Sequence, residues 1–294
     1  MALRLFSLNG FIAKTDLKQK GFKIKKWITV KMLEIKNLSK TYADGTQALK
    51  NVSFNLERGE FLVIIGLSGS GKSTLLRCIN RLIEPTSGSI TWDGADVCAA
   101  KGAELRKIRS QIGMIFQHFN LVKRLSVINN VLSGRLGRVS TWKSLYYKFS
   151  KKDYQDAYSA LKKVGITEQA QKRADELSGG QQQRVGIARA IMQEPLMVLA
   201  DEPVASLDPV LAHTILGYIE KMNQEQDITV ICSLHYLDLV QRYATRVIGL
   251  KDGEIVYRGT GEDIRRMTDR EFREIYGEDA ERVNVGKPVK EAKL

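Results

Sequence analysis

The chain has 294 residues, of which 43% are hydrophobic and 27% charged, and its formal net charge is +13. This length suffices for one large or two modest domains with a well-buried core, and the composition is that of a soluble globular protein. No apolar run approaches the roughly 20 residues that a membrane-spanning helix needs. The three cysteines lack metal-ligand spacing, which predicts reduced, mostly buried thiols.

Positive charge is concentrated at the N-terminus and in the middle of the chain. Residues 1–31 hold eight Lys/Arg against one acidic residue, and residues 119–176 hold twelve against five, so each segment contributes +7 and the remainder is nearly neutral. This pattern suits a protein beside an anionic inner membrane leaflet at least as well as one that binds nucleic acid. Solvated basic surfaces explain it equally well. A nearly neutral core predicts no nucleic-acid partner.

Residues 1–31 differ in character from the remainder of the chain. They lack a small-residue cleavage site behind a clean apolar core, so a signal peptide is not expected. Met32 opens a segment that is typical of a natural start. We interpret residues 1–31 as a basic, disordered N-terminal extension that reflects the choice of start site, with an amphipathic surface anchor as the alternative. Mass spectrometry of the native N-terminus distinguishes the two.

From Met32 onward, expected strands and helices alternate. The run Phe61–Ile65 is continuously apolar, as in a strand buried on both faces, and a helix is expected from Lys72. Pro85–Gly88 and Asp93-Gly94 are turn signals around a short strand. The alternation predicts an α/β chain with a largely parallel central sheet. The expected strands are residues 33–37, 48–55, 61–65, 89–92, 112–116, 197–200, 228–232, 247–250 and 255–257.

A phosphate-binding loop follows the first apolar strand. Residues 66–73 match G-x-x-x-x-G-K-S and are followed by a further threonine. The glycines let backbone N–H groups converge on phosphate oxygens, and the helix N-terminus adds a favourable dipole. We expect Lys72 to reach the β- and γ-phosphates and Ser73 to bind Mg²⁺. The residues expected to contact the nucleotide are Gly66, Ser68, Gly69, Ser70, Gly71, Lys72, Ser73 and Thr74.

The middle and the end of the chain are expected to be mostly helical. Residues 119–176 contain apolar side chains at helical spacing that predict one packed face. Residues 269–277 are expected to include a short helix, and residues 278–294 to form a mobile tail. The side chains of the predicted face are Tyr154, Ala157, Tyr158, Leu161 and Val164.

Two carboxylates follow the apolar strand Met197–Ala200. Ligands of open α/β sheets bind at the carboxyl ends of the strands, which is where Asp201 and Glu202 emerge. We expect Asp201 to hold Mg²⁺ through water, and Glu202 to act as general base for the attacking water. A general base contributes typically ~10²–10⁴-fold. A surface acidic pair is the alternative, which the distant phosphate loop disfavours.

Residues 177–181 read LSGGQ, which resembles the signature of the ABC ATPases. The other motifs of that family occur in its order, and the resemblance covers about residues 32–260. It implies a P-loop NTPase with a mostly parallel central sheet, an antiparallel β subdomain and an inserted helical subdomain at about 119–180. The ATP-binding domain would then span residues 32–277.

The resemblance also implies roles for single residues. Gln117 matches the glutamine that senses Mg²⁺ and the nucleophilic water, and His235 matches the switch histidine at the γ-phosphate. Tyr42 matches the aromatic that stacks on adenine, and Asp208, after Ser206-Leu207, matches the loop that crosses the dimer interface. Taken singly, Tyr42 is more often a strand aromatic, and His235 is more often a capping or core histidine.

The signature implies a dimer. Its polar atoms lie at an expected helix N-terminus and can bind a γ-phosphate, which gives the chain two anion sites. Two copies arranged head to tail let each phosphate loop face the partner's signature, with two ATP molecules and Mg²⁺ in the interface. The implied activity is ATP hydrolysis. The signature residues expected to contact nucleotide are Ser178, Gly179, Gly180 and Gln181.

The stretch after Gln117 most resembles the ATP-binding subunit of phosphonate importers. The pattern FNLV-x-RLSV-x-x-NVL in residues 119–132 carries this resemblance, together with the basic aromatic segment Trp142–Phe149 and Ser233-Leu234-His235. It implies transmembrane permease subunits, whose coupling helix would meet residues near Gln117 and in 119–149, and an extracytoplasmic solute-binding protein. The chain would lie peripherally at the cytoplasmic face of the membrane. Intramolecular packing explains the aromatic residues equally well.

Two alternatives stay open at this point. Phosphonate, phosphite or a phosphate ester fits the resemblance, whereas an importer of another small solute, such as an amino acid or phosphate, is the alternative within transport. An ABC ATPase acting on DNA or ribosomes belongs to another class. It is disfavoured because the chain has neither a long coiled-coil insertion nor a second ATPase domain.

Overall fold

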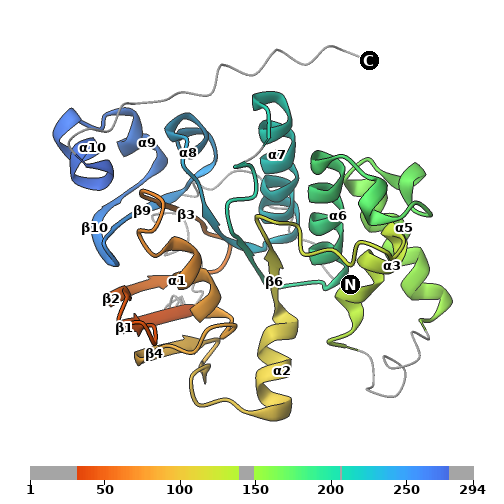
Figure 1. Ribbon diagram of the computed structural model, residues 1–294, viewed down its shortest axis with the longest axis horizontal. Coiled ribbons are helices and arrows are strands. Elements are labelled where there is room, and N and C mark those ends of the chain that lie inside the picture. Colours follow the sequence, from red (N-terminus) through yellow and green to blue (C-terminus); the bar gives the residue numbers. More distant parts are fainter. Residues whose placement is uncertain (1–31, 139–148, 206, 278–294) are drawn as a thin grey trace, which may run out of the picture. The chain divides into compact units, whose positions relative to one another are not determined.

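The computed structural model describes residues 32–138, 149–205 and 207–277 (Figure 1). The N-terminal extension, most of the Trp142–Phe149 segment, Ser206 and the tail 278–294 lie outside the described residues. No helix in the described ranges is both long and apolar enough to cross a membrane.

The central sheet has six strands in the order β10-β9-β3-β8-β7-β6. All neighbouring pairs are parallel except β10 with β9, which confirms the predicted, largely parallel sheet. Carboxyl ends of parallel strands share one edge, so residues that follow β3, β7 and β8 meet there. The strands are β3 (Phe61–Ile65), β6 (Ile112–Ile115), β7 (Met197–Ala200), β8 (Thr229–Ser233), β9 (Arg246–Lys251) and β10 (Glu254–Gly259).

Strand β3 is buried on both faces and separates two hydrophobic cores. Phe61, Val63 and Ile65 join the core that includes the helical region, whereas Leu62 and Ile64 join the core beneath the second sheet. This division follows from the alternation of side chains along a strand. The phosphate loop follows this buried strand directly, so it begins at the carboxyl edge of the sheet.

A second, antiparallel sheet has the order β2-β1-β4-β5, as the family resemblance implied. It shares the second core with helix α1, which lies beside β1 and β2 in Figure 1. Leu33 pairs with Leu56 on β2 and with Trp92 on β4, and all three are buried. The strands are β1 (Leu33–Thr41), β2 (Gln47–Leu56), β4 (Ser87–Trp92) and β5 (Ala95–Asp96).

The helical region differs in part from the prediction. Residues 119–126 contain no helix, and Phe119 and Asn120 adopt positive φ. Tyr154 and Tyr158 are exposed, so the predicted packed face is wrong at these two positions, although Ala157, Leu161 and Val164 are buried. The remaining elements of this region are α3 (Val127–Leu132), η2 (Ser133–Arg135), α5 (Lys151–Lys163), η3 (Thr167–Gln169), η4 (Ala174–Glu176) and α6 (Gly179–Met192).

Helices pack around the central sheet (Figure 1), and α9 and α10 follow its last strand. Helix α2 was not predicted, whereas α10 matches the expected short helix. Cys78 and Cys232 are buried and Cys98 is partly buried, and all three are free thiols, which confirms that prediction. The helices are α1 (Lys72–Ile79), α2 (Gly102–Gln111), α7 (Pro209–Gln226), α8 (Leu237–Tyr243), α9 (Gly261–Arg265) and α10 (Asp269–Tyr276).

Candidate functional site

The loop between β3 and α1 is shaped by glycines. Gly66, Gly69 and Gly71 have φ values of 142°, 82° and 104°, which L side chains rarely adopt. A Cβ on Gly71 would also overlap the carbonyl oxygen of Ala48 on β2. Gly71 is the N-cap of α1, so the loop ends in free helix N–H groups that can bind an anion.

Lys72 is directed back into this loop. Its side chain is 3% exposed, and Nζ donates to the carbonyl oxygens of Gly66 at 2.8 Å and Leu67 at 2.7 Å. Nζ lies 3.8 Å from Oε1 of Glu202. Burial lowers the pKa of Lys72, and the nearby carboxylates oppose this effect. Two carbonyl oxygens of the loop therefore hold the ammonium group beside the expected position of the phosphates.

Ser73 and Asp201 contact each other across the end of the sheet. The Ser73 hydroxyl donates to Oδ1 of Asp201 at 2.7 Å, and Arg77 on α1 lies 3.3 Å from Oδ2. Asp201 is fully buried. Magnesium takes oxygen ligands and usually combines one or two protein groups with water and substrate phosphates. The hydroxyl and the carboxylate fit that requirement, and in the described part of the chain no cluster of three or more His, Cys, Asp or Glu forms an alternative metal site.

Glu202 has an unusual backbone and two partners, one at the end of β8 and one just after it. Its φ is 47°, in the left-handed region. Its backbone N–H donates to the Ser233 hydroxyl at 2.8 Å, and Oε1 lies 2.6 Å from Nε2 of His235. The hydrogen bond with His235 lowers the pKa of Glu202 below its usual range. Glu202 is therefore ionised at neutral pH, as a general base must be.

A cavity of about 220 Å³ is lined by six of the eight nucleotide residues predicted at the phosphate loop, together with Gln117 and Glu202. Tyr42 lies beside it, because its hydroxyl is 3.1 Å from Oγ1 of Thr74. Ser70 is buried behind the loop, and its hydroxyl has no hydrogen-bond partner among the described residues. The residues that line the cavity are Ala48, Ser68, Gly69, Gly71, Lys72, Ser73, Thr74, Gln117 and Glu202.

The signature residues lie outside this cavity, and Ser178, Gly180 and Gln181 line another one of about 500 Å³. Ser178 is the N-cap of α6, and its Oγ accepts from the N–H of Gln181 while the Gln181 side chain accepts from the N–H of Ser178. Gly179 and Gly180 occupy the first turn, where N–H groups lack acceptors within the helix. Within one chain, the structure does not join the signature to the phosphate loop.

Asp208 is exposed and caps helix α7, because its carboxylate accepts from the N–H of Leu211 at 3.0 Å. The preceding Leu207 packs against the first core, whereas Ser206 lies outside the described residues. The capped start of α7 keeps this loop at the surface. It lies close to Gly180, because a Cβ on Gly180 would overlap the side chain of Leu211 in α7.

Two residues near the carboxylates were missed by the sequence interpretation. Arg77 contacts Asp201 from α1, and Ser233 contacts Glu202 from β8. The Ser-Leu-His order in the sequence does not show that the serine faces β7. The pairing of β7 with β8 places Ser233 beside Glu202, and only the folded sheet reveals this contact.

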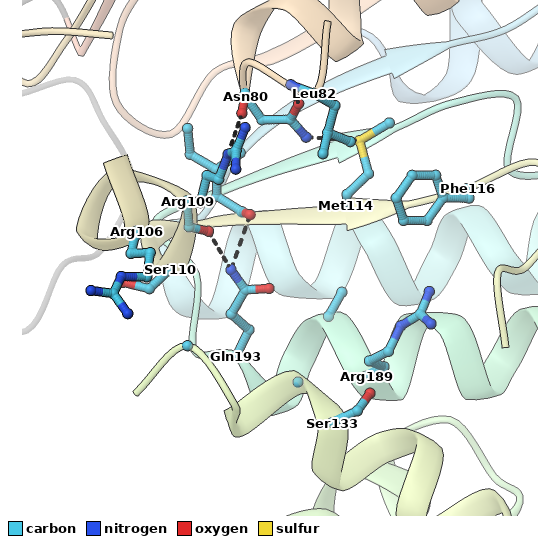
Figure 2. A pocket seen from close by; sticks show the side chains of 14 residues that line it. Asn80, Leu82, Arg106, Arg109, Ser110, Met114, Phe116, Ser133, Arg189 and Gln193 are labelled. Carbon is cyan, nitrogen blue, oxygen red and sulfur yellow. Dashed lines mark hydrogen bonds between the residues drawn. The ribbon is translucent and has the colours of Figure 1, made fainter. Parts of the chain in front are cut away.

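A further groove of about 320 Å³ lies between α2, β6 and α6 (Figure 2). Its polar walls are tied by Arg109, which donates to the carbonyl oxygens of Asn80 and Arg81, and by Gln193, which donates to those of Arg109 and Ile112. Its remaining cations are Arg106 and Arg189, whereas its apolar side chains include Leu82, Met114 and Phe116. Among the described residues, none that lines this groove is acidic.

Arg189 connects the groove to the segment after Gln117. Its guanidinium donates to the carbonyl oxygens of Phe119 at 2.9 Å and Asn120 at 2.6 Å, and it lies 5.9 Å from the ring centroid of Phe116. Burial lowers the pKa of Arg189. These contacts link helix α6, whose N-terminus carries the signature, to the loop that leaves β6.

Comparison with known proteins gives one consistent result. Residues 49–205 match the family model described as ABC transporter. The chain is 57% identical over 253 residues to the phosphonates import ATP-binding protein PhnC of Bdellovibrio bacteriovorus, covering 86% of this chain and 96% of that protein. It is 54% identical to the protein of the same name from Shouchella clausii, covering 84% and 91%.

Solved structures agree on the fold. A dimeric structure of the ATP-binding cassette MJ0796 bound to ADP and Pi has a TM-score of 0.71 and 37% identity, covering 78% of this chain and 98% of that one. The ADP conformation of MJ1267, an ATP-binding cassette of an ABC transporter, has a TM-score of 0.70 and 31% identity, covering 81% and 94%.

Proposed function

Because this chain belongs to the ATP-binding proteins of ABC transporters, which are ATP hydrolases, we propose that it powers the import of phosphonate, phosphite or a phosphate ester. The observation that carries the substrate is the identity of 54–57% with relatives named phosphonates import ATP-binding protein, over more than nine-tenths of their length. The residues of the site support the ATPase part independently, because phosphate, metal and water ligands converge at one edge of the sheet.

We propose that the cavity beside the phosphate loop holds the triphosphate of ATP. The loop N–H groups and Lys72 bind the phosphates, and Tyr42 stacks on the adenine. Ser73, Asp201 and Gln117 hold Mg²⁺, with Asp201 acting through water. Bound there, Mg²⁺ supplies charge neutralisation at the β- and γ-phosphate oxygens.

The chemistry assigned to this chain's residues is proton abstraction and positioning. Glu202 accepts a proton from the attacking water, because its carboxylate is ionised and borders the cavity. His235 holds that carboxylate and contacts the γ-phosphate. Lys72 balances the negative charge that builds up on the phosphoryl oxygens, as phosphoryl transfer requires.

We propose a head-to-tail dimer of two copies. The signature and the phosphate loop line different cavities of one chain, so one nucleotide meets both only when a second copy supplies the signature. Ser178 keeps its hydroxyl proton available, since its oxygen accepts in the cap, and the N–H groups of Gly179 and Gly180 are free of intrahelical acceptors. Gln181 fixes this geometry, and Asp208 faces the partner.

The groove of Figure 2 supports a membrane partner. The described residues that line it are cationic, apolar or neutral polar, which suits a short helix of a permease subunit that carries apolar side chains and a carboxylate. A helix bound in this groove would meet Arg189, whose guanidinium also holds the loop after Gln117. The chain would then lie peripherally at the cytoplasmic face of the membrane, and an extracytoplasmic solute-binding protein would deliver the substrate.

Substrate choice is tested by transport. The complete complex, reconstituted with its permease and binding protein in proteoliposomes, should take up a labelled phosphonate only with internal ATP. Orthophosphate and an amino acid serve as matched competitors. Uptake of either at a higher rate than any phosphonate, phosphite or phosphate ester would replace the proposed substrate with that solute.

A further inference from the structure

We propose that Ser233 is a positioning residue for ATP hydrolysis, because its hydroxyl holds the backbone of Glu202. This inference rests on the proposed role of Glu202 as general base. It concerns a residue at the end of β8 that is not among the described residues lining the cavity beside the phosphate loop.

Ser233 is fully buried. Within the described residues, all hydrogen bonds of its hydroxyl are with residues at the end of β7 or just after it. Its oxygen accepts from the N–H of Glu202 at 2.8 Å. Its proton has two acceptors within reach, the carbonyl oxygen of Ala200 at 3.5 Å and Oδ1 of Asp201 at 3.4 Å. One small side chain thus touches three consecutive residues at the end of β7.

The backbone that Ser233 holds is the strained one. Glu202 has a φ of 47°, which is unfavourable for a non-glycine residue and persists only where neighbouring contacts enforce it. The hydrogen bond from its N–H to Ser233 is such a contact. Without it, a partly buried N–H would be left without its partner, and the backbone could relax toward an ordinary conformation.

The end of β8 and the segment that follows it therefore hold Glu202 at two points. Ser233 binds the backbone N–H, and His235, two residues later, binds the carboxylate at 2.6 Å. Two fixed points determine the direction of a side chain, whereas one leaves it free to rotate. Loss of Ser233 should therefore misdirect the carboxylate while leaving the phosphate loop unchanged.

The test compares Ser233→Ala with a matched control on the same strand. Thr229 is also fully buried, and its hydroxyl accepts from the backbone N–H of Gly59 at 2.9 Å, at the opposite end of β8. Thr229→Val therefore removes an equivalent hydrogen bond away from the carboxylates. Steady-state ATP hydrolysis, ATP affinity and thermal stability are measured for both variants of the full chain.

We expect Ser233→Ala to lower kcat by on the order of 10- to 100-fold with ATP affinity changed less than about twofold, since small misplacements of a reacting group have effects of this size. Thr229→Val should keep kcat within about threefold, even where its stability falls equally. Equal kcat losses in both variants, or a loss of ATP affinity that accounts for the effect of Ser233→Ala, would overturn the proposal.

A double-variant cycle separates this inference from the role of Glu202 itself. In a Glu202→Gln background, Ser233→Ala should lower the residual rate by less than about twofold, because the group that it positions is already removed. A full additional loss would show that Ser233 acts by another route. Near-normal turnover of Glu202→Gln alone would instead reject the proposed general base, and with it this role for Ser233.

Discussion

Oε1 of Glu202 lies 2.6 Å from Nε2 of His235, and this contact joins the ends of two adjacent parallel strands. The carboxylate follows β7 and the imidazole follows β8, so the sheet itself sets their separation. Lys72 approaches the same carboxylate oxygen from the phosphate loop at 3.8 Å. Lys72 and His235 therefore both approach the carboxylate of the proposed general base.

Replacing Glu202 with glutamine tests the catalytic role. The amide keeps the size of the side chain but cannot accept a proton, so ATP hydrolysis should slow by about 10²–10⁴-fold. ATP-dependent dimerisation, measured by size-exclusion chromatography with light scattering, should persist. Turnover within about threefold of the parent would remove Glu202 from this role.

Replacing Lys72 with alanine should weaken nucleotide binding itself. The side chain supplies a buried positive charge at the phosphate loop, so equilibrium titration with an ATP analogue should give at least a roughly tenfold higher Kd. Lys107→Ala, which removes an exposed lysine of α2, is the matched control and should bind like the parent. Unchanged affinity in Lys72→Ala would contradict the assignment of the loop.

Arg135 should matter for stability rather than for chemistry. It is 8% exposed and pairs with Asp156 at 2.6 Å and Glu194 at 3.1 Å, which joins η2 to α5 and to the end of α6. Arg135→Met should reduce the free energy of unfolding by about 2 kcal/mol, less than for a fully buried network because its partners are partly exposed. Urea unfolding measures this change.

The control for that experiment is Arg265→Met, which removes an exposed ion pair with Glu262. Exposed pairs contribute about 0–1 kcal/mol, so its unfolding curve should nearly match that of the parent. Equal losses of unfolding free energy in the two variants would show that the Arg135 network stabilises the fold no more than an exposed ion pair does.

The cysteines should differ in their reaction with iodoacetamide. Burial raises the pKa of Cys78 to about 12 and also raises the pKa of Cys98, which is only partly buried. A raised pKa means less thiolate at any given pH, so raising the pH from 7 to 9 should promote alkylation of Cys98 before that of Cys78. Mass spectrometry of the native protein follows both sites, and faster modification of Cys78 would contradict its packing.

Much of the fold could be predicted because its signals are local. The apolar runs at β3 and β7 can hardly be placed elsewhere than in a buried sheet, and the glycines before Lys72 mark both a turn and the start of α1. Helix α2 gave no comparable signal, because Ile108 is its only buried residue and charged side chains dominate the rest. An exposed helix has no apolar stripe from which to predict it.

The helical region shows the same limit in another form. Tyr154 and Tyr158 share the spacing of Ala157 and Leu161, yet they are 39% and 38% exposed, and the Tyr158 hydroxyl accepts from Gln171. Tyrosine suits both a core and a wet surface, so periodicity alone could not separate the two. In the site, motifs identified the groups expected to touch ATP, whereas Ser233 became visible only through the pairing of β7 with β8.

Growth of a deletion strain tests the central claim most directly. With a phosphonate as sole phosphorus source and no redundant uptake system, deletion of this chain should abolish growth, while growth on orthophosphate continues. The parent gene should restore growth on the phosphonate, whereas the Glu202→Gln variant, expressed at the same level, should not. Undiminished growth of the deletion strain on phosphonate, phosphite and phosphate esters would contradict the proposed substrate.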